Sequence, residues 1–219
     1  MIKFLQIILV ILAVIVSFQP IVVAQVEAVN NDLGYKDKIT IDADYKKELL
    51  ALGFNNGEYL KLKNEAISHH PYVVMDKVVH TAEVLALRPD GTSLKGSVPS
   101  NVSQEDLLVA SRLACVGAIN VIKQAADGDL SRVRKIANIR YLTLSEPEYI
   151  DYALVSNECS TLMVRVFGQV VGSHSRFAIG LVASPNNESF KLNLIACLLY
   201  TSDAADDLLC VDLGGRRII

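Results

Sequence analysis

Two segments with helical spacing of apolar residues, separated by one alternating segment, constrain the fold of this chain more than any other feature. The helical patterns cover residues 107–126 and 148–167. Between them, residues 133–144 place apolar side chains among polar ones, as expected for a strand that buries one face. Because neither helix can bury its apolar stripe alone, both are expected to pack on a sheet that contains this strand.

Local signals mark the ends of these segments and predict further strands. Ser103 is a suitable N-cap residue for the first helix, with Asp106 three residues later. Residues 73–87 are rich in β-branched and apolar side chains and end at a turn, Arg88-Pro89-Asp90-Gly91. Two more strands are expected at residues 176–183 and 190–195, and a short helix at residues 45–52. The sequence therefore predicts an α+β fold with a mixed sheet and two helices packed on one face.

The first 24 residues have the three-part layout of a secretory signal peptide. Lys3 supplies a positive charge, residues 4–18 are almost wholly apolar, and Val22-Val23-Ala24 forms a small-residue cleavage pattern. The alternative is an uncleaved anchor, but the apolar run is shorter than the ~20 residues that span a bilayer. We therefore expect residues 1–24 to be removed and residues 25–44 to form an N-terminal linker. The mature protein is expected to be periplasmic or extracellular, without a stable membrane anchor.

The C-terminal segment indicates a different origin from the rest of the chain. Residues 197–206 back-translate to a transposase adapter used in sequencing libraries, and residues 211–219 back-translate to the flow-cell end of the same adapter. The two matches stand in the right order and are separated by an index-sized gap. The alternative is a native tail, which would require both matches to arise by chance. We therefore expect one folded domain at residues 45–196 and a non-native, poorly packed tail at residues 197–219.

With residues 1–24 and 197–219 set aside, the charge and the cysteine content are counted for the core at residues 25–196 alone. Removing Lys3, the two tail arginines and the four tail aspartates from the formal net charge of -3 leaves residues 25–196 at -2. Nucleic-acid affinity is largely electrostatic, so an acidic core is not expected to bind nucleic acid. Cys115 and Cys159 both fall in apolar helical patterns, which predicts packed thiols rather than a disulfide or a metal pair.

Three segments carry a resemblance to a known family. Residues 95–136 contain a leading glycine turn, a Val-Ser helix start and a loop that reads Gly-Asp-Leu-Ser-Arg-Val. Residues 157–168 resemble the end of a second helix, and residues 174–185 resemble a His-Ala-Arg-Ser strand motif. In this order they resemble the RidA/YjgF family, often labelled endoribonuclease L-PSP, over residues 45–196.

The resemblance implies a chorismate-mutase-like α+β fold and a homotrimer with ligand clefts between subunits. Deaminating members of the family hydrolyse reactive enamines and imines made by pyridoxal-phosphate enzymes, and they release a keto acid and ammonia. An arginine pairs with the substrate carboxylate, and a glutamate on the last strand acts on water. We therefore expect a small carboxylate as the ligand and no cofactor.

Four residues are candidates for this site. Arg176 matches the family arginine, and a planar guanidinium binds a carboxylate in a bidentate way. Asn157 matches a polar position near the cleft. Taken without the family motif, Arg176 reads as a surface arginine in an ordinary salt bridge and Asn157 as a helix-surface amide. The catalytic glutamate position holds Lys191, whose ammonium cannot act as a base, and Glu83 belongs to an altered family segment, Thr81-Ala82-Glu83. Glu83 could act as an acid or pair with Lys191.

Three classes of function remain: a deaminase-like enzyme, a catalytically impaired trimeric binding module for small carboxylates, and a ribonuclease, which the acidic core disfavours. Lys191 separates the first two, because Lys191→Glu is expected to create or raise deaminase activity if the family mechanism applies. His69, His70 and His80 could be read as a metal cluster, but adjacent histidines diverge on a strand and no spaced carboxylates or cysteines support them. No metal site is expected.

Overall fold

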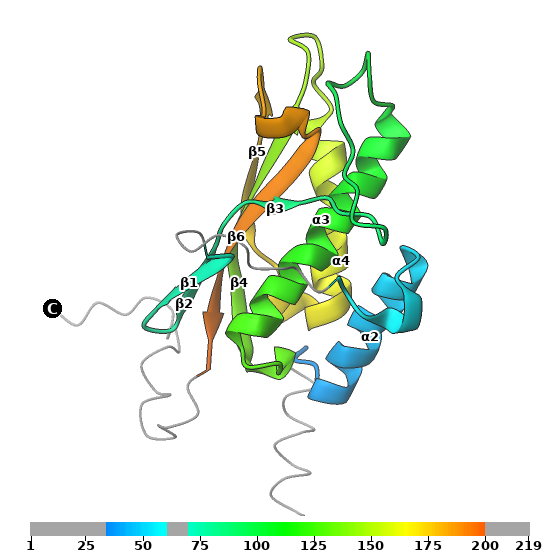
Figure 1. Cartoon of the computed structure of the whole chain (residues 1–219). Helices are drawn as coiled ribbons and strands as arrows, with labels where there is room; N and C mark the ends of the chain where they lie inside the picture. Colours follow the sequence, from blue (N-terminus) through cyan, green and yellow to red (C-terminus); the bar gives the residue numbers. More distant parts are fainter. Residues whose placement is uncertain (1–33, 61–69, 200–219) are drawn as a thin grey trace, which may run out of the picture.

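The computed structural model describes residues 34–60 and 70–199. One sheet forms the first layer, helices α3 (Gln104–Ala125) and α4 (Tyr152–Gly172) cover one of its faces, and helix α2 (Lys38–Ala51) lies on the outer side of those two helices (Figure 1). Short 3-10 turns η1 (Asn55–Gly57), η2 (Leu130–Arg132) and η3 (Pro185–Asn187) connect these elements. The expected packing of two helices on one face of a sheet is confirmed.

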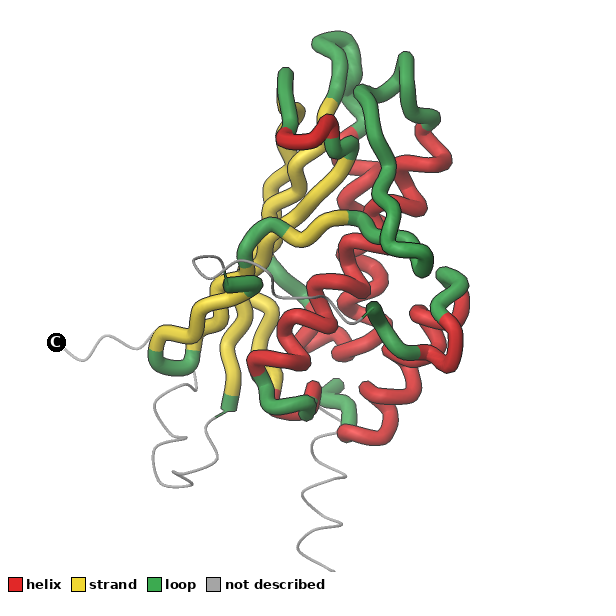
Figure 2. Tube along the Cα trace, viewed as in Figure 1, coloured by secondary structure: helices red, strands yellow, loops and turns green. Residues whose placement is uncertain are grey.

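The sheet is mixed, with the strand order β1-β2-β6-β4-β5 and with β3 paired to β6. Its strands are β1 (Tyr72–Met75), β2 (Val78–Thr81), β3 (Val84–Leu85), β4 (Val133–Leu144), β5 (Ser175–Leu181) and β6 (Phe190–Leu198). Strands β4 and β5 are parallel because α4 crosses over between them, whereas β6 runs antiparallel to β2, β3 and β4. Figure 2 shows the helices gathered on one side of the strands.

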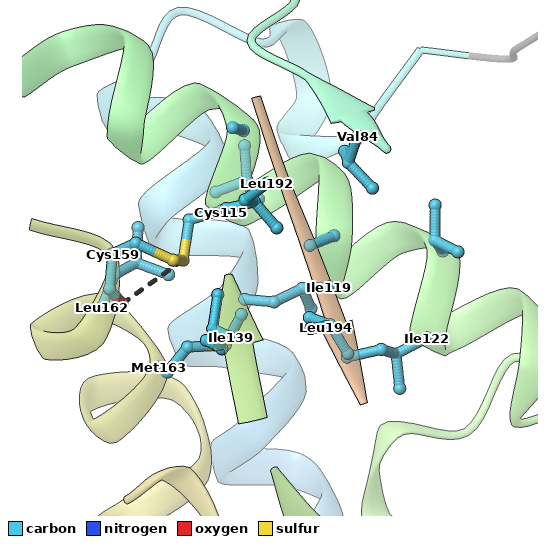
Figure 3. Close-up of a cluster of buried hydrophobic side chains, with 14 of the residues drawn as sticks. Val84, Cys115, Ile119, Ile122, Ile139, Cys159, Leu162, Met163, Leu192 and Leu194 are labelled. Atoms are coloured by element: carbon cyan, nitrogen blue, oxygen red, sulfur yellow. Dashed lines mark hydrogen bonds between the residues drawn. A yellow bond between two sulfur atoms is a disulfide. The ribbon is translucent and has the colours of Figure 1, made fainter. Parts of the chain in front are cut away.

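Helix α3 begins where its sequence signals place it. The side-chain oxygen of Ser103 accepts a hydrogen bond from the backbone nitrogen of Asp106 at 3.1 Å. Glu105 and Asp106 lie in the first turn and Lys123 in the last, which suits the helix dipole. The apolar side of α3 faces the sheet, and Ile119 and Ile122 lie against side chains of β4, β6 and α4 in the core (Figure 3).

Helix α4 begins at Tyr152, later than the predicted start at residue 148. It extends past the predicted end at residue 167, because Gly168 bends the chain without ending the helical segment. Gly168 has φ +78, and a Cβ built there would lie 2.7 Å from the carbonyl oxygen of Gly34. Only glycine combines this backbone conformation with so close an approach. The helical segment ends at Gly172, and β5 begins three residues later at Ser175.

The N-terminal boundary of the domain was predicted too late. Helix α2 begins at Lys38, inside residues 25–44, and its N-cap Asp37 accepts a hydrogen bond from the Thr40 backbone nitrogen at 2.7 Å. Tyr45 of α2 donates a hydrogen bond to the Val116 carbonyl oxygen of α3 at 3.0 Å. The sequence pattern was weak because exposed apolar residues of α2 dilute its buried face.

Cys115 of α3 and Cys159 of α4 form a disulfide bond, so the prediction of packed thiols was wrong (Figure 3). Both residues are fully buried, and their Cα atoms lie 5.3 Å apart, within the range that a disulfide requires. Each cysteine fits an apolar helical stripe by itself. Only the packing of the two helices places them opposite each other.

Strand β6 continues past Ala196, where the folded domain was expected to end. Cys197 is paired with Val78 of β2 and Lys135 of β4, and Leu198 has an exposed fraction of 6%. Poor packing was therefore the wrong expectation for these two residues, because they complete the ladder. Residues 200–219 lie outside the described part of the chain, as do residues 1–33 and His69. None of the described helices is long and apolar enough to cross a membrane.

Candidate functional site

Arg176 lies near the start of β5, on the sheet face that α4 covers. Its partner on β4 is the fully buried Ile139, and paired residues of a parallel ladder point to the same side. The guanidinium donates from Nη2 to Asn157 Oδ1 at 2.6 Å and from Nη1 to Ser160 Oγ at 2.8 Å. The structure therefore brings Arg176 and Asn157 together, as the family motif suggested.

The environment of Arg176 lacks a negative partner. Both acceptors of its hydrogen bonds, Asn157 and Ser160, are neutral, and Arg176 makes no ion pair within residues 34–60 and 70–199. Its side chain is exposed. An exposed guanidinium that is oriented by neutral oxygens retains its charge and free N–H donors for an anion, and a carboxylate fits the planar donor pair.

Three further side chains join this cluster, and sequence reasoning did not select them as site residues. Ser160 Oγ lies 3.1 Å from His174 Nε2 and 3.1 Å from the Tyr141 hydroxyl oxygen. His174 Nδ1 lies 2.7 Å from the Gly172 carbonyl oxygen. Only one signal in the sequence marked these side chains: His174 is the first residue of the strand motif that contains Arg176. We call Tyr141, Asn157, Ser160, His174 and Arg176 the arginine cluster.

Burial and neighbouring charge set the protonation of this cluster. Burial lowers the pKa of His174 below its ordinary value, and the positive charges of Arg176 and Lys135 lower it further. Burial raises the pKa of Tyr141 to about 12. At neutral pH the imidazole is therefore largely uncharged and the phenol keeps its proton.

Lys191 of β6 and Glu83, which lies between β2 and β3, form an ion pair with a distance of 2.6 Å between Nζ and Oε2. The exposed fractions of the two side chains are 5% and 48%. The Thr81 hydroxyl accepts a hydrogen bond from the Leu194 backbone nitrogen at 3.0 Å, so the ladder is interrupted beside Glu83. The structure thus forms the Lys191–Glu83 pair that the sequence suggested.

The ion pair and the arginine cluster lie on opposite faces of the sheet within one protomer. Lys191 stands between Phe190 and Leu192, which both face the helix-covered core, so its own side chain points to the other face. Arg176 points toward α4. Lys191 is consequently not a reacting group for a ligand held by Arg176 of the same protomer.

A separate hollow of about 480 Å³ lies between α2, η1 and α3, and it shares no residue with the arginine cluster. Its polar lining includes Asp42 and Lys123, whose charges lie 3.8 Å apart. Within the described residues, no group of three or more histidine, cysteine, aspartate or glutamate side chains is placed to hold a metal ion.

Comparison with known proteins finds similar sequences and similar folds. No family model matches the chain. Protein TCP17 of Trypanosoma cruzi is 29% identical over 120 residues, which cover 55% of this chain and 74% of that protein. The solved structure of Atu1372 from Agrobacterium tumefaciens, a protein of unknown function, has a TM-score of 0.64 at 25% identity and covers 74% of this chain and 96% of its own. The solved structure of a candidate endoribonuclease from Shewanella oneidensis has a TM-score of 0.61 at 25% identity. The similarity covers 70% of this chain and 98% of that protein.

The protein therefore belongs to the α+β class, with helices packed on one face of a mixed sheet. It shares this fold with the solved structures of Atu1372 and of the Shewanella oneidensis protein.

Proposed function

We propose that this protein binds small carboxylates at Arg176 and acts on reactive enamine or imine carboxylates by deaminase-like hydrolysis. The observation that carries the proposal is the orientation of an exposed, unneutralised guanidinium by Asn157 and Ser160. A 2-imino acid presents a carboxylate next to its reactive carbon. Anchoring the carboxylate on Arg176 would therefore hold that carbon within reach of the neighbouring side chains of the cluster.

A second candidate is a binding module for small carboxylates without turnover. The Lys191–Glu83 ion pair favours it, because the position that holds the family's catalytic glutamate is occupied by a buried ammonium. Carboxylate binding is common to both candidates, and only the release of keto acid and ammonia separates them.

Replacing Arg176 with alanine is expected to weaken binding of a small carboxylate such as pyruvate by about 10- to 100-fold, since hydrogen bonds to charged groups contribute roughly 1.5–3 kcal/mol. Isothermal titration or NMR titration would measure the change. Arg88→Ala is the matched control, because Arg88 holds its turn through backbone hydrogen bonds that alanine keeps. Equal affinities of Arg176→Ala and the unmutated protein would exclude Arg176 as the anchor.

A homotrimer is the expected assembly, since ligand clefts of the family lie between subunits. Exposed apolar side chains on the sheet support an interface, among them Phe177 and Ile179 of the edge strand β5. Light scattering of the folded chain should give three times the mass of one protomer. A monodisperse monomer would contradict the trimer.

Export is supported by the signal-like N-terminus and by the Cys115–Cys159 disulfide, because disulfides persist mainly in oxidising compartments. Mass spectrometry of protein from its host should find a mature N-terminus at or near Gln25. Recovery of soluble cytoplasmic protein that retains Met1 would contradict export.

A further inference from the structure

The hydrogen bonds of the arginine cluster have a defined direction. The Gly172 carbonyl oxygen can only accept, so His174 Nδ1 must carry a proton and donate it at 2.7 Å. In a neutral imidazole Nε2 is then the unprotonated nitrogen and accepts a hydrogen bond. Its nearer hydroxyl is that of Ser160, at 3.1 Å.

The remaining contacts of Ser160 are consistent with this direction. Arg176 Nη1 has no lone pair to offer and donates to Ser160 Oγ at 2.8 Å. The Tyr141 hydroxyl, which keeps its proton at neutral pH, can donate to the same oxygen at 3.1 Å. With these two donors on its oxygen, Ser160 can donate its own proton to His174 Nε2, and the arrangement is a hydroxyl, a fixed histidine base and a cation within one cluster.

We infer that His174, acting with Ser160, is the proton-transfer group for hydrolysis of an imine carboxylate anchored by Arg176. The inference rests on the proposed carboxylate site and adds the base that the Lys191–Glu83 pair does not supply. His174 and Arg176 both contact Ser160, so a substrate on the guanidinium lies one hydroxyl away from the imidazole. His174 is partly buried, and the carbonyl of Gly172 holds its ring orientation.

The reaction balances without a cofactor. A water oxygen forms a bond to the carbon of the protonated imine, the C=N electron pair moves to nitrogen, and the water proton passes to His174 Nε2, directly or through Ser160. His174 returns this proton to the nitrogen. The carbon–nitrogen bond then breaks as the new hydroxyl becomes a carbonyl and gives its proton to the imidazole. The released ammonia takes this proton from the imidazolium, so the products are a keto acid and an ammonium ion and His174 is neutral again.

The pH dependence has a definite sign. The base works when Nε2 is unprotonated, so the rate should rise with pH through the pKa of His174 and reach its plateau above it. Burial and the charges of Arg176 and Lys135 lower that pKa, which places the rise below the ordinary histidine value. The other titratable group that contacts the ring, Tyr141, stays protonated throughout this range.

The test uses the folded protein and freshly generated 2-aminoacrylate, with keto-acid release as the readout. His174→Gln should lower kcat by roughly 100-fold or more, the usual contribution of a general base, and abolish the low-pH limb of the profile. Ser160→Ala should lower kcat by about tenfold and keep the histidine-dependent limb. His80→Gln, on β2 and outside the cluster, is the matched control and should leave the rate unchanged.

Binding of pyruvate, measured in parallel, separates this inference from the proposed function. Retained binding with no hydrolysis, or with hydrolysis that His174→Gln does not reduce, would overturn the role of His174 and leave the carboxylate site intact. If the unmutated protein does not bind pyruvate, the proposed function itself is overturned.

Discussion

Replacing both Cys115 and Cys159 with alanine is expected to lower the free energy of unfolding by about 4 kcal/mol. The disulfide closes a loop with a sequence separation of 44 residues, and the loss of unfolded-state entropy on closing a loop of that size corresponds to about this value. Since both positions are fully buried, the small cavities left by the two sulfur atoms add to the loss. In a protein of this length the melting temperature should fall by roughly 8–16 °C.

Scanning calorimetry of the oxidised protein and of the double variant measures this loss. The matched control is the unmutated protein after denaturation in reductant and refolding, which should show a loss close to that of the double variant. Mass spectrometry under non-reducing and reducing conditions detects the Cys115–Cys159 disulfide bond directly. Equal melting temperatures of the oxidised and reduced forms would show that the two helices are held by packing alone.

Replacing Lys191 with glutamate is expected to destabilise the fold by about 3–5 kcal/mol, the usual cost of leaving an uncompensated charge buried. The new carboxylate would stand at a position with a 5% exposed side chain and would face Glu83 instead of pairing with it. This outcome differs from the gain of deaminase activity that the family position alone suggests. In one protomer, residue 191 points to the sheet face opposite the arginine cluster, so a carboxylate there does not reach a substrate on Arg176.

Urea unfolding measures the stability change, and keto-acid release measures activity in the same samples. Exchanging the two charges in Lys191→Glu with Glu83→Lys should recover part of the lost stability. Replacing both residues with methionine should be close to neutral, because apolar replacement of a whole ion pair is often tolerated. A Lys191→Glu variant as stable as its parent, with faster hydrolysis, would restore residue 191 as the catalytic position.

The sequence by itself determined the elements that have strong local signals. The strand at residues 133–144 was predicted at its observed bounds, because its alternation reflects one buried face along the whole strand. The start of α3 followed from Ser103 and Asp106, whose capping hydrogen bond involves residues three apart. Helix α2 was placed too late, since Ile39 and Leu50 are exposed and blur the stripe formed by its buried side.

Contacts between distant segments were decided only by the tertiary structure. Cys115 and Cys159 each looked like a packed thiol, and the crossing of α3 and α4 alone brings them into bonding distance. The motif around Arg176 named the arginine and Asn157, but Ser160 and His174 joined them because the bend at Gly168 returns the chain to β5 beside α4. Periodicity records which face of an element is buried. Periodicity does not show which residue of another element lies opposite. The packing of distant elements against each other sets those contacts, and they include the disulfide, the Lys191–Glu83 pair and the arginine cluster.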